Sequence, residues 1–356
     1  MTHKVDMVMD FQYGSTGKGL IAGYLAKREQ YDTVVCSFAT NAGHTYIDKE
    51  RGIHVMTQQL PTGAISSPTV KNILIGPGAL IHAQTLANEI SQNAEALKGK
   101  RILIHPHAAV VEDYHAKQEI DMGMTKIGST AKGCGAAAME RIQRSPDNPN
   151  IAVTRFFGTP LFQHVATLDD YRDALNDAEN VLVEGAQGFS LSMYHGQYPY
   201  TTSRDVTPWQ IAADCGLPYR WASYVQVIGA MRTYPIRVNN RDGSSGPCYR
   251  DQNELQWDDL RGVGIAPELT TVTKLKRRIF TFSALQAEEA SFHCGGYWDT
   301  KVFLNFANYC SDMEELARII KAIETPTKIQ MNPSRVAWTG WGPDDSDVRE
   351  YSGVTK

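Results

Sequence analysis

The sequence predicts an α/β fold, in which one large domain is built on a mostly parallel central sheet flanked by helices. Three observations support this prediction. Short runs that are apolar at every position recur along the chain, spacers of helix length separate them, and the first run ends in a glycine-rich turn that leads into a helix-like stretch. Alternating strands and helices of this kind are typical of a sheet with helices on both faces.

The apolar runs justify the strands one by one. A first strand begins near Val5, and further strands are expected at 33–36, 72–75, 101–104, 180–183 and 223–228. A strand that is apolar on every position suits a sheet buried on both faces. Helices are expected at 20–27, 83–96, 130–144, 169–177 and 313–323. Neither an internal repeat nor a low-complexity linker interrupts the pattern, so residues 1–356 are interpreted as a single domain.

Composition excludes several classes of protein. The chain has 356 residues and a formal net charge of −4, which argues against a general nucleic-acid or membrane-surface binder. No apolar run is long enough to span a bilayer and no signal peptide is evident, so a cytoplasmic protein is expected. Six scattered cysteines lack CxxC spacing and are expected to be reduced thiols. His105 and His107 lie two residues apart, but no matching ligand cluster makes them a metal site.

The glycine-rich turn after the first strand is a candidate phosphate-binding loop. Glycines allow backbone amides to converge on an anion, a helix N-terminus adds positive potential, and a lysine supplies a point charge. The spacing differs from that of the common P-loop. The alternative is an ordinary glycine turn into a helix. The residues of the loop are Gly14, Ser15, Thr16, Gly17, Lys18 and Gly19.

Two further segments follow strand ends. The segment 39–46 contains Gly43 beside His44, which permits close backbone approach to a ligand while the imidazole exchanges a proton; a structural histidine is the alternative. The segment 183–188 places Gln187 among glycines, where the amide could contact a base, ribose or phosphate, or be buried in a turn.

Two polar segments complete the set. In 126–135, hydroxyls and glycines precede a helix and could bind a second anion, although Ser129 or Thr130 could instead be a simple N-cap. In 269–278, four cations and several hydroxyls fit a loop that clamps a dicarboxylate and phosphates; a solvated charged run is the alternative.

Together and in this order, the five segments resemble the adenylosuccinate synthetase family. The family pattern is Gly-Asp-Glu-Gly-Lys-Gly, Asn-Ala-Gly-His-Thr, Ile-Gly-Thr-Thr-Gly-Arg-Gly, Glu-Gly-Ala-Gln-Gly, Tyr-Pro-x-x-Thr-Ser and a Thr-Gly-Arg-x-Arg-Arg loop. The segments 41–45 and 184–188 match it without change, and the resemblance covers nearly the whole chain. It implies an adenylosuccinate synthetase-like fold, a carbon–nitrogen ligase that uses Mg²⁺ and L-aspartate, and a homodimer.

The resemblance also implies roles for individual residues. The catalytic residues would be Ser15, Lys18 and His44, and the aspartate site would be Thr273, Arg277 and Arg278. The substrate nucleotide would contact Ser15, Asn41, Ser129, Thr130, Gln187 and Thr202, with Arg144 reaching it from a second subunit. The donor nucleotide would contact Gly14, Thr16, Gly17, Lys18, Gly19, Gly43, His44, Thr45, Lys301, Phe303, Gly340, Gly342 and Pro343. Ser15 and the Gly43 carbonyl would line the metal.

Ser15 departs from the family pattern, which has an aspartate that binds Mg²⁺ and takes the N1 proton of IMP. A serine hydroxyl is a weak base near neutral pH and a poorer metal ligand. It is smaller and uncharged, and it can accept a hydrogen bond from the 2-amino group of guanine. This departure resembles the phage-type branch of the family, which joins dGMP to aspartate and gives 2-amino-2′-deoxyadenylosuccinate. We therefore expect dGMP as the substrate, in host cytoplasm if the protein is phage-encoded. The residue that removes the N1 proton is not evident, and Asp10 at the strand end is one candidate.

Phe303 is a second departure on the alignment of Thr300-Lys301-Val302-Phe303 with the family's Thr-Lys-Leu-Asp. A phenyl ring cannot accept the hydrogen bonds that guanine donates, so ATP or dATP is expected as the phosphate donor. Three alternatives stay open: an ordinary synthetase that uses IMP and GTP, a nucleotide-binding regulator that has lost catalysis, and a P-loop kinase.

Overall fold

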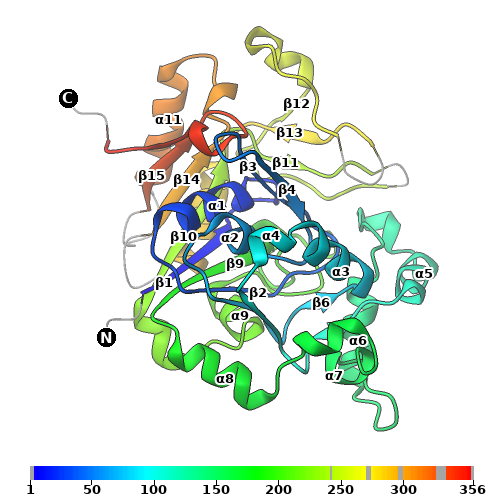
Figure 1. Cartoon of the computed structure of the whole chain (residues 1–356). Helices are drawn as coiled ribbons and strands as arrows, with labels where there is room; N and C mark the ends of the chain where they lie inside the picture. The colour runs from blue at the N-terminus through cyan, green and yellow to red at the C-terminus, as the bar shows by residue number, and fades with distance from the viewer. Residues whose placement is uncertain (1–3, 241–242, 270–273, 296–299, 326–333, 354–356) are drawn as a thin grey trace.

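A nine-stranded sheet runs through the centre of the molecule (Figure 1). The computed structural model describes residues 4–240, 243–269, 274–295, 300–325 and 334–353. Neighbouring strands are parallel except at one edge, where β16 runs antiparallel to β15. In spatial order the strands are β16 (Val348–Glu350), β15 (Arg335–Gly340), β14 (Lys301–Asn305), β10 (Val225–Arg232), β1 (Lys4–Asp10), β9 (Asn180–Gly188), β2 (Thr33–Cys36), β5 (Asn72–Ile75) and β7 (Arg101–Ile104).

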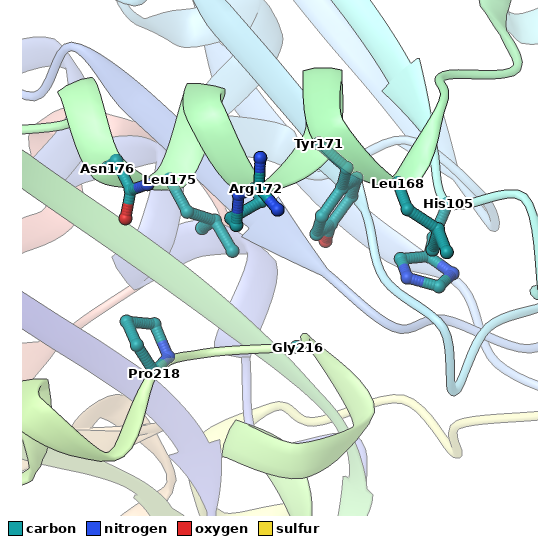
Figure 2. A pocket seen from close by; sticks show the side chains of 8 residues that line it. All are labelled: His105, Leu168, Tyr171, Arg172, Leu175, Asn176, Gly216 and Pro218. Atoms are coloured by element: carbon teal, nitrogen blue, oxygen red, sulfur yellow. The ribbon is translucent and has the colours of Figure 1, made fainter.

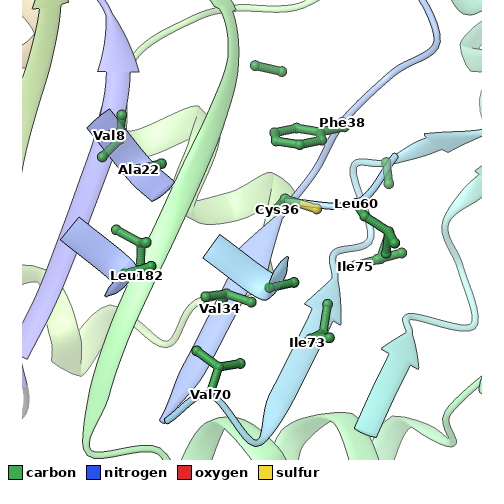
Figure 3. Close-up of a cluster of buried hydrophobic side chains, with 14 of the residues drawn as sticks. Val8, Ala22, Val34, Cys36, Phe38, Leu60, Val70, Ile73, Ile75 and Leu182 are labelled. Carbon is green, nitrogen blue, oxygen red and sulfur yellow. The ribbon is translucent and has the colours of Figure 1, made fainter. Parts of the chain in front are cut away.

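Helices cover both faces of this sheet, because successive strand residues point to opposite sides. Val8, Val34 and Ile73 pack on the face shown in Figure 3, beneath α1 (Lys18–Arg28), α2 (Thr62–Ser66) and α3 (Ala83–Gln92). Their neighbours Met7 and Val35 point to the other face. That face is covered by α8 (Leu168–Asp177), α9 (Pro208–Asp214), α10 (Ala284–Cys294) and α11 (Met313–Glu324). The prediction of a mostly parallel sheet buried on both faces is confirmed.

Smaller elements surround the main sheet. A hairpin is formed by β3 (His44–Asp48) and β4 (Ile53–Thr57), a parallel pair by β6 (Leu80–Ile81) and β8 (Ala109–Val110), and a three-stranded sheet by β11 (Ile236–Arg237), β13 (Arg278–Phe280) and β12 (Glu254–Leu255). The remaining α-helices of the described residues are α4 (Ala94–Leu97), α5 (Asp113–Asp121), α6 (Cys134–Gln143) and α7 (Ala152–Arg155).

The predicted elements differ from the observed ones mainly at their ends. Strands 33–36, 72–75 and 101–104 have the predicted bounds, whereas β9 extends to Gly188. The helix predicted over 83–96 is divided at Asn93. The helix predicted over 130–144 begins only at Cys134, because Gly133 before it has a φ of 80° and ends a non-helical loop.

The end of α1 is fixed to the last part of the chain. Arg28 donates two hydrogen bonds of 2.9 Å to the carboxylate of Asp345, which lies in the short 3₁₀ helix η7 (Asp345–Asp347). Lys27 lies 2.8 Å from Asp48 and 3.3 Å from Asp345. The helix that begins at the glycine loop is therefore held at its carboxyl end.

Two sequence expectations can be compared with the described residues. All six cysteines are free thiols, as predicted. Among the described helices, none combines the length and the apolar character needed to cross a bilayer.

Candidate active site

The predicted site lies along the edge where the parallel strands end. Asp10, Cys36, Gly188, Arg232 and Asn305 are the last residues of five neighbouring strands and therefore share this edge. In open α/β sheets, ligands bind in the crevice beyond the carboxyl ends of the strands. The glycine loop leaves the central strand, β1, at this edge.

The glycine loop has the conformation that the sequence indicates. Gly14 and Gly17 have φ values of 95° and 92°, in the left-handed region that glycine adopts without strain. A side chain at Gly17 would also meet Asn305, whose Nδ2 lies 2.2 Å from the position of an added Cβ. Ser15 has a φ of 56° although it is not glycine, and it is exposed to solvent. The α1 helix begins at Lys18, so its first amides face this loop.

Asp10 organises the loop from beneath. Its carboxylate is fully buried and accepts hydrogen bonds from the backbone amides of Gln12 (2.8 Å) and Gly14 (3.2 Å). The hydroxyl of Thr16 lies 2.5 Å from the same carboxylate, and the Lys18 ammonium lies 3.4 Å from it. The lysine predicted to bind phosphate is thus held by an internal carboxylate. The sequence signal for a carboxylate that holds the loop is an acidic residue at the last strand position before the glycines.

β14 and β15 support the loop on its other side, and here the sequence alignment was wrong. Lys301 lies at the amino end of β14, exposed, with its ammonium 5.9 Å from the centre of the Trp338 ring, so it is not brought to the glycine loop. Phe303 is fully buried and packs beneath Gly17 and Gly340, so its ring supports the loop from the core. At the carboxyl end of the strand, Asn305 donates through Nδ2 to the Thr16 carbonyl at 3.1 Å. The alignment of Thr300-Lys301 with the family's Thr-Lys therefore placed the donor-binding motif too close to the amino end of the strand.

The histidine of the second motif is buried beside a carboxylate. The His44 ring stacks on Phe38 with centroids 4.0 Å apart, and its Nδ1 has no hydrogen-bond partner but lies 3.9 Å from Oε2 of Glu184. Burial, together with the positive charge of Lys18, lowers the pKa of His44 to about 3. The imidazole is therefore neutral at pH 7, in which state one ring nitrogen carries a proton that it can donate.

Glu184 is held by the α2 helix. It accepts hydrogen bonds from the Gly63 amide (2.7 Å) and the Thr62 hydroxyl (3.1 Å). Burial raises the pKa of Glu184 to about 7. The sequence motif contains this residue, but only the fold shows that it faces His44.

The structure brings the first, second and fourth motifs together. Gly19 packs so closely on β3 that an added Cβ would lie 2.9 Å from the Thr45 carbonyl. Nε2 of Gln187 donates to Oδ1 of Asn41 at 2.8 Å. Gln187 also has a φ of 64°, a second non-glycine residue in the left-handed region.

The third motif lies in the loop before α6. Ser129 and Thr130 are not N-caps of this helix, because Gly133 occupies the cap position. The segment that holds Thr202 approaches from the other side, since an added Cβ on Gly135 would lie 3.8 Å from the neighbouring Ser203. Arg144 is exposed at the carboxyl end of α6.

The cation segment is only partly described. Thr273 lies outside the described residues. The Arg278 guanidinium is occupied by the carboxylate of Glu254 (2.6 and 2.7 Å) and the Gly246 carbonyl (2.6 Å). The Arg277 amide donates to the Glu268 carbonyl at 2.8 Å, and burial lowers the pKa of the Arg277 guanidinium.

The last predicted donor contacts follow β15. Gly340 ends this strand, and an added Cβ there would lie 2.1 Å from Oδ1 of Asn305. Gly342 is equally crowded by Asp347, with 2.3 Å to the nearest carboxylate oxygen, and Pro343 follows it. Glycine at 340 allows this segment to pack closely on the end of β14, and glycine at 342 allows it to pack closely on Asp347.

A hollow elsewhere contains none of the predicted site residues. It has a volume of about 170 Å³ and lies between α8 and the turn at Gly216 (Figure 2). Its lining is formed by His105, Leu168, Tyr171, Arg172, Leu175, Asn176, Gly216 and Pro218. Within the residues that the structure describes, no group of three or more histidine, cysteine, aspartate and glutamate side chains could hold a metal ion, and this includes the neighbourhood of His105 and His107.

Known proteins of one enzyme family are similar to this chain in sequence. The family model for adenylosuccinate synthetase matches residues 7–164 and 157–317. The N6-succino-2-amino-2′-deoxyadenylate synthase of Acinetobacter phage SH-Ab 15497 is 43% identical, over 97% of this chain and 93% of the relative. The adenylosuccinate synthetase of Pyrococcus horikoshii is 32% identical, over 78% and 76%.

A solved structure is similar over the whole chain. It is the succinoaminodeoxyadenylate synthetase of cyanophage S-2L, bound to dGMP and to dATP as an energy donor. It has a TM-score of 0.89 and 41% sequence identity, and the match covers 98% of this chain and 96% of the other. The structure places the loop after β1, the His44 segment and the Gln187 segment at one edge of the sheet. The family model and these relatives show that the chain belongs to the adenylosuccinate synthetase family.

Proposed function

We propose that this protein is a ligase that joins L-aspartate to dGMP and gives 2-amino-2′-deoxyadenylosuccinate, with ATP or dATP as the phosphate donor. The observation that carries the proposal is Ser15, a neutral and exposed hydroxyl in the glycine loop where the family has a catalytic aspartate. Four relatives of about the same length, 42 to 44% identical, are phage enzymes named for this reaction.

The reaction takes two steps. The γ-phosphoryl group of the donor first passes to O6 of dGMP, which makes O6 a good leaving group. The α-amine of aspartate then displaces phosphate at C6. Positioning and charge neutralisation carry the first step, because the protein contributes little covalent chemistry to phosphoryl transfer.

The residues near the donor phosphates support this assignment. Lys18 and the first amides of α1 would hold the transferring group, and phosphate would compete with Asp10 for the lysine. His44 is neutral and buried, so its one N–H would donate to charge that develops on the leaving oxygen.

dGMP would lie between four of the motifs. Ser15 would face C2, and the amides of Asn41 and Gln187, which already contact each other, would bind the nucleotide. Ser129 and Thr130 would bind its 5′-phosphate together with Thr202.

Aspartate would bind at Thr273, Arg277 and Arg278. Arg278 would have to exchange its contact with Glu254 for the aspartate carboxylate.

The identity of the phosphate donor is inferred from a related enzyme, because Phe303 is buried in the core and cannot contact the donor base. The cyanophage enzyme is bound to dATP as an energy donor, and this chain is 41% identical to it. Gly340, Gly342 and Pro343 would contact the donor. Asn305, the last residue of β14, and Phe306, which follows it, replace Lys301 as the nearby residues from this part of the chain.

In this site, Mg²⁺ would be coordinated mainly by oxygen atoms of the substrate phosphates. Mg²⁺ is usually bound by few protein oxygens together with substrate phosphates and water. The Ser15 hydroxyl and the Gly43 carbonyl are neutral oxygen donors, so the donor phosphates would supply most of the charge. The ion would neutralise the phosphates during transfer.

A homodimer completes the proposal. Arg144 would contact the nucleotide of a second copy. Apolar side chains are exposed on and near the same helix, with Ile142 69%, Met139 47% and Phe157 74% accessible in the single chain. An exposed apolar patch of this kind is typical of an association surface. We place the enzyme in the cytoplasm of the host cell.

One incubation tests the function. Purified protein is mixed with dGMP, aspartate and Mg²⁺, together with ATP, dATP or GTP, and the nucleotide is identified by its mass. We expect the aspartate adduct of dGMP with ATP or dATP. Turnover of IMP with GTP in preference to dGMP would identify an ordinary synthetase. Nucleotide binding without phosphate release would identify a regulator, and phosphorylation that needs no aspartate would identify a kinase.

A further inference from the structure

Arg232 lies at the centre of the site edge without belonging to any of the five motifs. It is the last residue of β10, and its backbone is fixed to the glycine loop. Its amide donates to Oε1 of Gln12 at 2.9 Å, and Nε2 of Gln12 donates to its carbonyl at 3.2 Å. The side chain is fully buried. The backbone that carries the Arg232 side chain is therefore held in place next to the loop.

The guanidinium connects two segments that the proposed reaction uses for different ligands. Its Nη1 donates to the Ser15 carbonyl at 3.2 Å. Its Nη2 lies 2.5 Å from Oε1 of Glu268, and its plane lies over Phe306, 3.8 Å from the ring centre. A planar fork with several donors can hold both partners at once, which an ammonium cannot.

Glu268 stands at the base of the cation segment. Its carbonyl accepts the Arg277 amide at 2.8 Å, and the next residue pairs with Lys276 in a β-bridge. Its carboxylate also accepts the Tyr309 hydroxyl at 3.2 Å. Arg232 thus joins the base of the proposed aspartate site to the loop that faces the purine.

Ser15 needs such a support. A serine with a φ of 56° is in a region that non-glycine residues seldom adopt, and such conformations persist when their surroundings hold them. The contact from Arg232 fixes the direction of the Ser15 carbonyl. The direction of its side chain depends on the same backbone conformation.

We infer that Arg232 and Glu268 are positioning residues that set the orientation of Ser15 and thereby the preference for a purine with a 2-amino group. The inference rests on the proposed function. It adds that the aspartate segment and the purine-facing loop are coupled through this one ion pair. Neither residue contacts the reacting atoms in this assignment.

The test compares dGMP with dIMP, which lacks only the 2-amino group. Dissociation constants of both are measured by calorimetry for the wild type and for Arg232→Met, which removes the donor to Ser15. Loss of one correctly placed hydrogen bond should lower the preference for dGMP by roughly threefold to tenfold. Arg232→Lys keeps one donor without the planar fork and should restore part of the preference.

Glu268→Gln provides a second variant that keeps an acceptor for Arg232 and removes the charge. We expect a smaller fall in the dGMP preference and a rise of roughly threefold in the KM for aspartate. The matched control is Arg51→Met. Arg51 also bonds a carboxylate, that of Asp48 (2.8 Å), and a distant carbonyl, that of Ser66 (2.8 Å), but it lies in the β3–β4 hairpin. The control should change neither quantity.

The outcomes separate this inference from the proposed function. If the wild type forms no aspartate adduct of dGMP, the proposed function fails. If the wild type forms it and the Arg232 and Glu268 variants bind dGMP and dIMP in the wild-type ratio, the pair is only structural and the inference is overturned. If Arg232→Met does not fold, Arg232→Lys and Glu268→Gln decide the matter.

Discussion

Replacing Asp10 with asparagine should destabilise the protein more than its small change in shape suggests. The carboxylate accepts two backbone amides and one hydroxyl and lies 3.4 Å from the Lys18 ammonium, all without solvent. Hydrogen bonds to a charged group contribute about 1.5–3 kcal/mol and neutral ones about 0.5–1.5, so each bond loses roughly 1 kcal/mol. The asparagine amide would also present a donor to the Thr16 hydroxyl or to the Lys18 ammonium. The expected loss is about 2–4 kcal/mol in the free energy of unfolding.

The assay is the thermal midpoint of the ligand-free protein at pH 7. Since the entropy of unfolding is about 2.1 cal/mol/K per residue, a change of about 1 kcal/mol moves the midpoint by only about 1–1.5 °C in a chain of this size, and a fall of roughly 3–5 °C is expected. The control is Asp32→Asn, because Asp32 accepts bonds from the amides of Glu179 (3.0 Å) and Asn180 (2.8 Å) and from the Thr33 hydroxyl (2.7 Å). No lysine or arginine is paired with it among the described residues. Asp32 is only partly buried, so the control should lose less stability than Asp10→Asn, and the difference measures what burial and Lys18 add. An unchanged midpoint for Asp10→Asn would refute the argument.

Three other predictions concern the reaction and its electrostatics. His44→Ala should lower kcat by about 10²–10⁴ if the imidazole is the acid; a fall below tenfold in steady-state turnover would exclude that role. Ser15→Asp should remain folded, since aspartate tolerates a positive φ, but its larger anionic side chain should lower kcat/KM for dGMP by roughly fivefold or more, and unchanged dGMP turnover would contradict the pocket argument. Glu184 has a folded pKa raised to about 7, so its stabilising contribution is complete below its unfolded pKa of about 4.5 and is lost as the pH rises through 7. Glu184→Gln should therefore gain about 3 kcal/mol relative to the wild type between pH 4.5 and pH 8 in urea unfolding; parallel stability curves would show that the carboxylate is not so perturbed.

The sequence predicted the sheet well because its strands are buried on both faces. In runs such as 33–36 and 72–75, every residue after the first is apolar, as expected of a short strand buried on both faces. The start of α6 was predicted too early, since the pattern of apolar residues does not reveal the backbone turn at Gly133. Boundaries of this kind depend on single φ angles rather than on periodicity.

Candidate site residues could be chosen from the sequence where they belong to a recognisable motif, and not where they stand outside one. Asn41 and Gln187 could be chosen from their motifs, and they meet in the structure. Arg232 and Glu268 could not, because each is a single charged residue outside the five motifs, and only the fold shows that they pair. Lys301 was chosen from a short match to a motif, but the strand register places it away from the edge where ligands bind.

The contact between Arg28 and Asp345 has a consequence for the order in which the protein forms during synthesis. The two residues are separated by 317 positions, so the ribosome releases the first helix long before its partner exists. Early nascent chains thus contain the glycine loop, which we propose binds nucleotide, without the anchor of the helix that follows it. Firm nucleotide binding should therefore emerge only when translation is nearly finished.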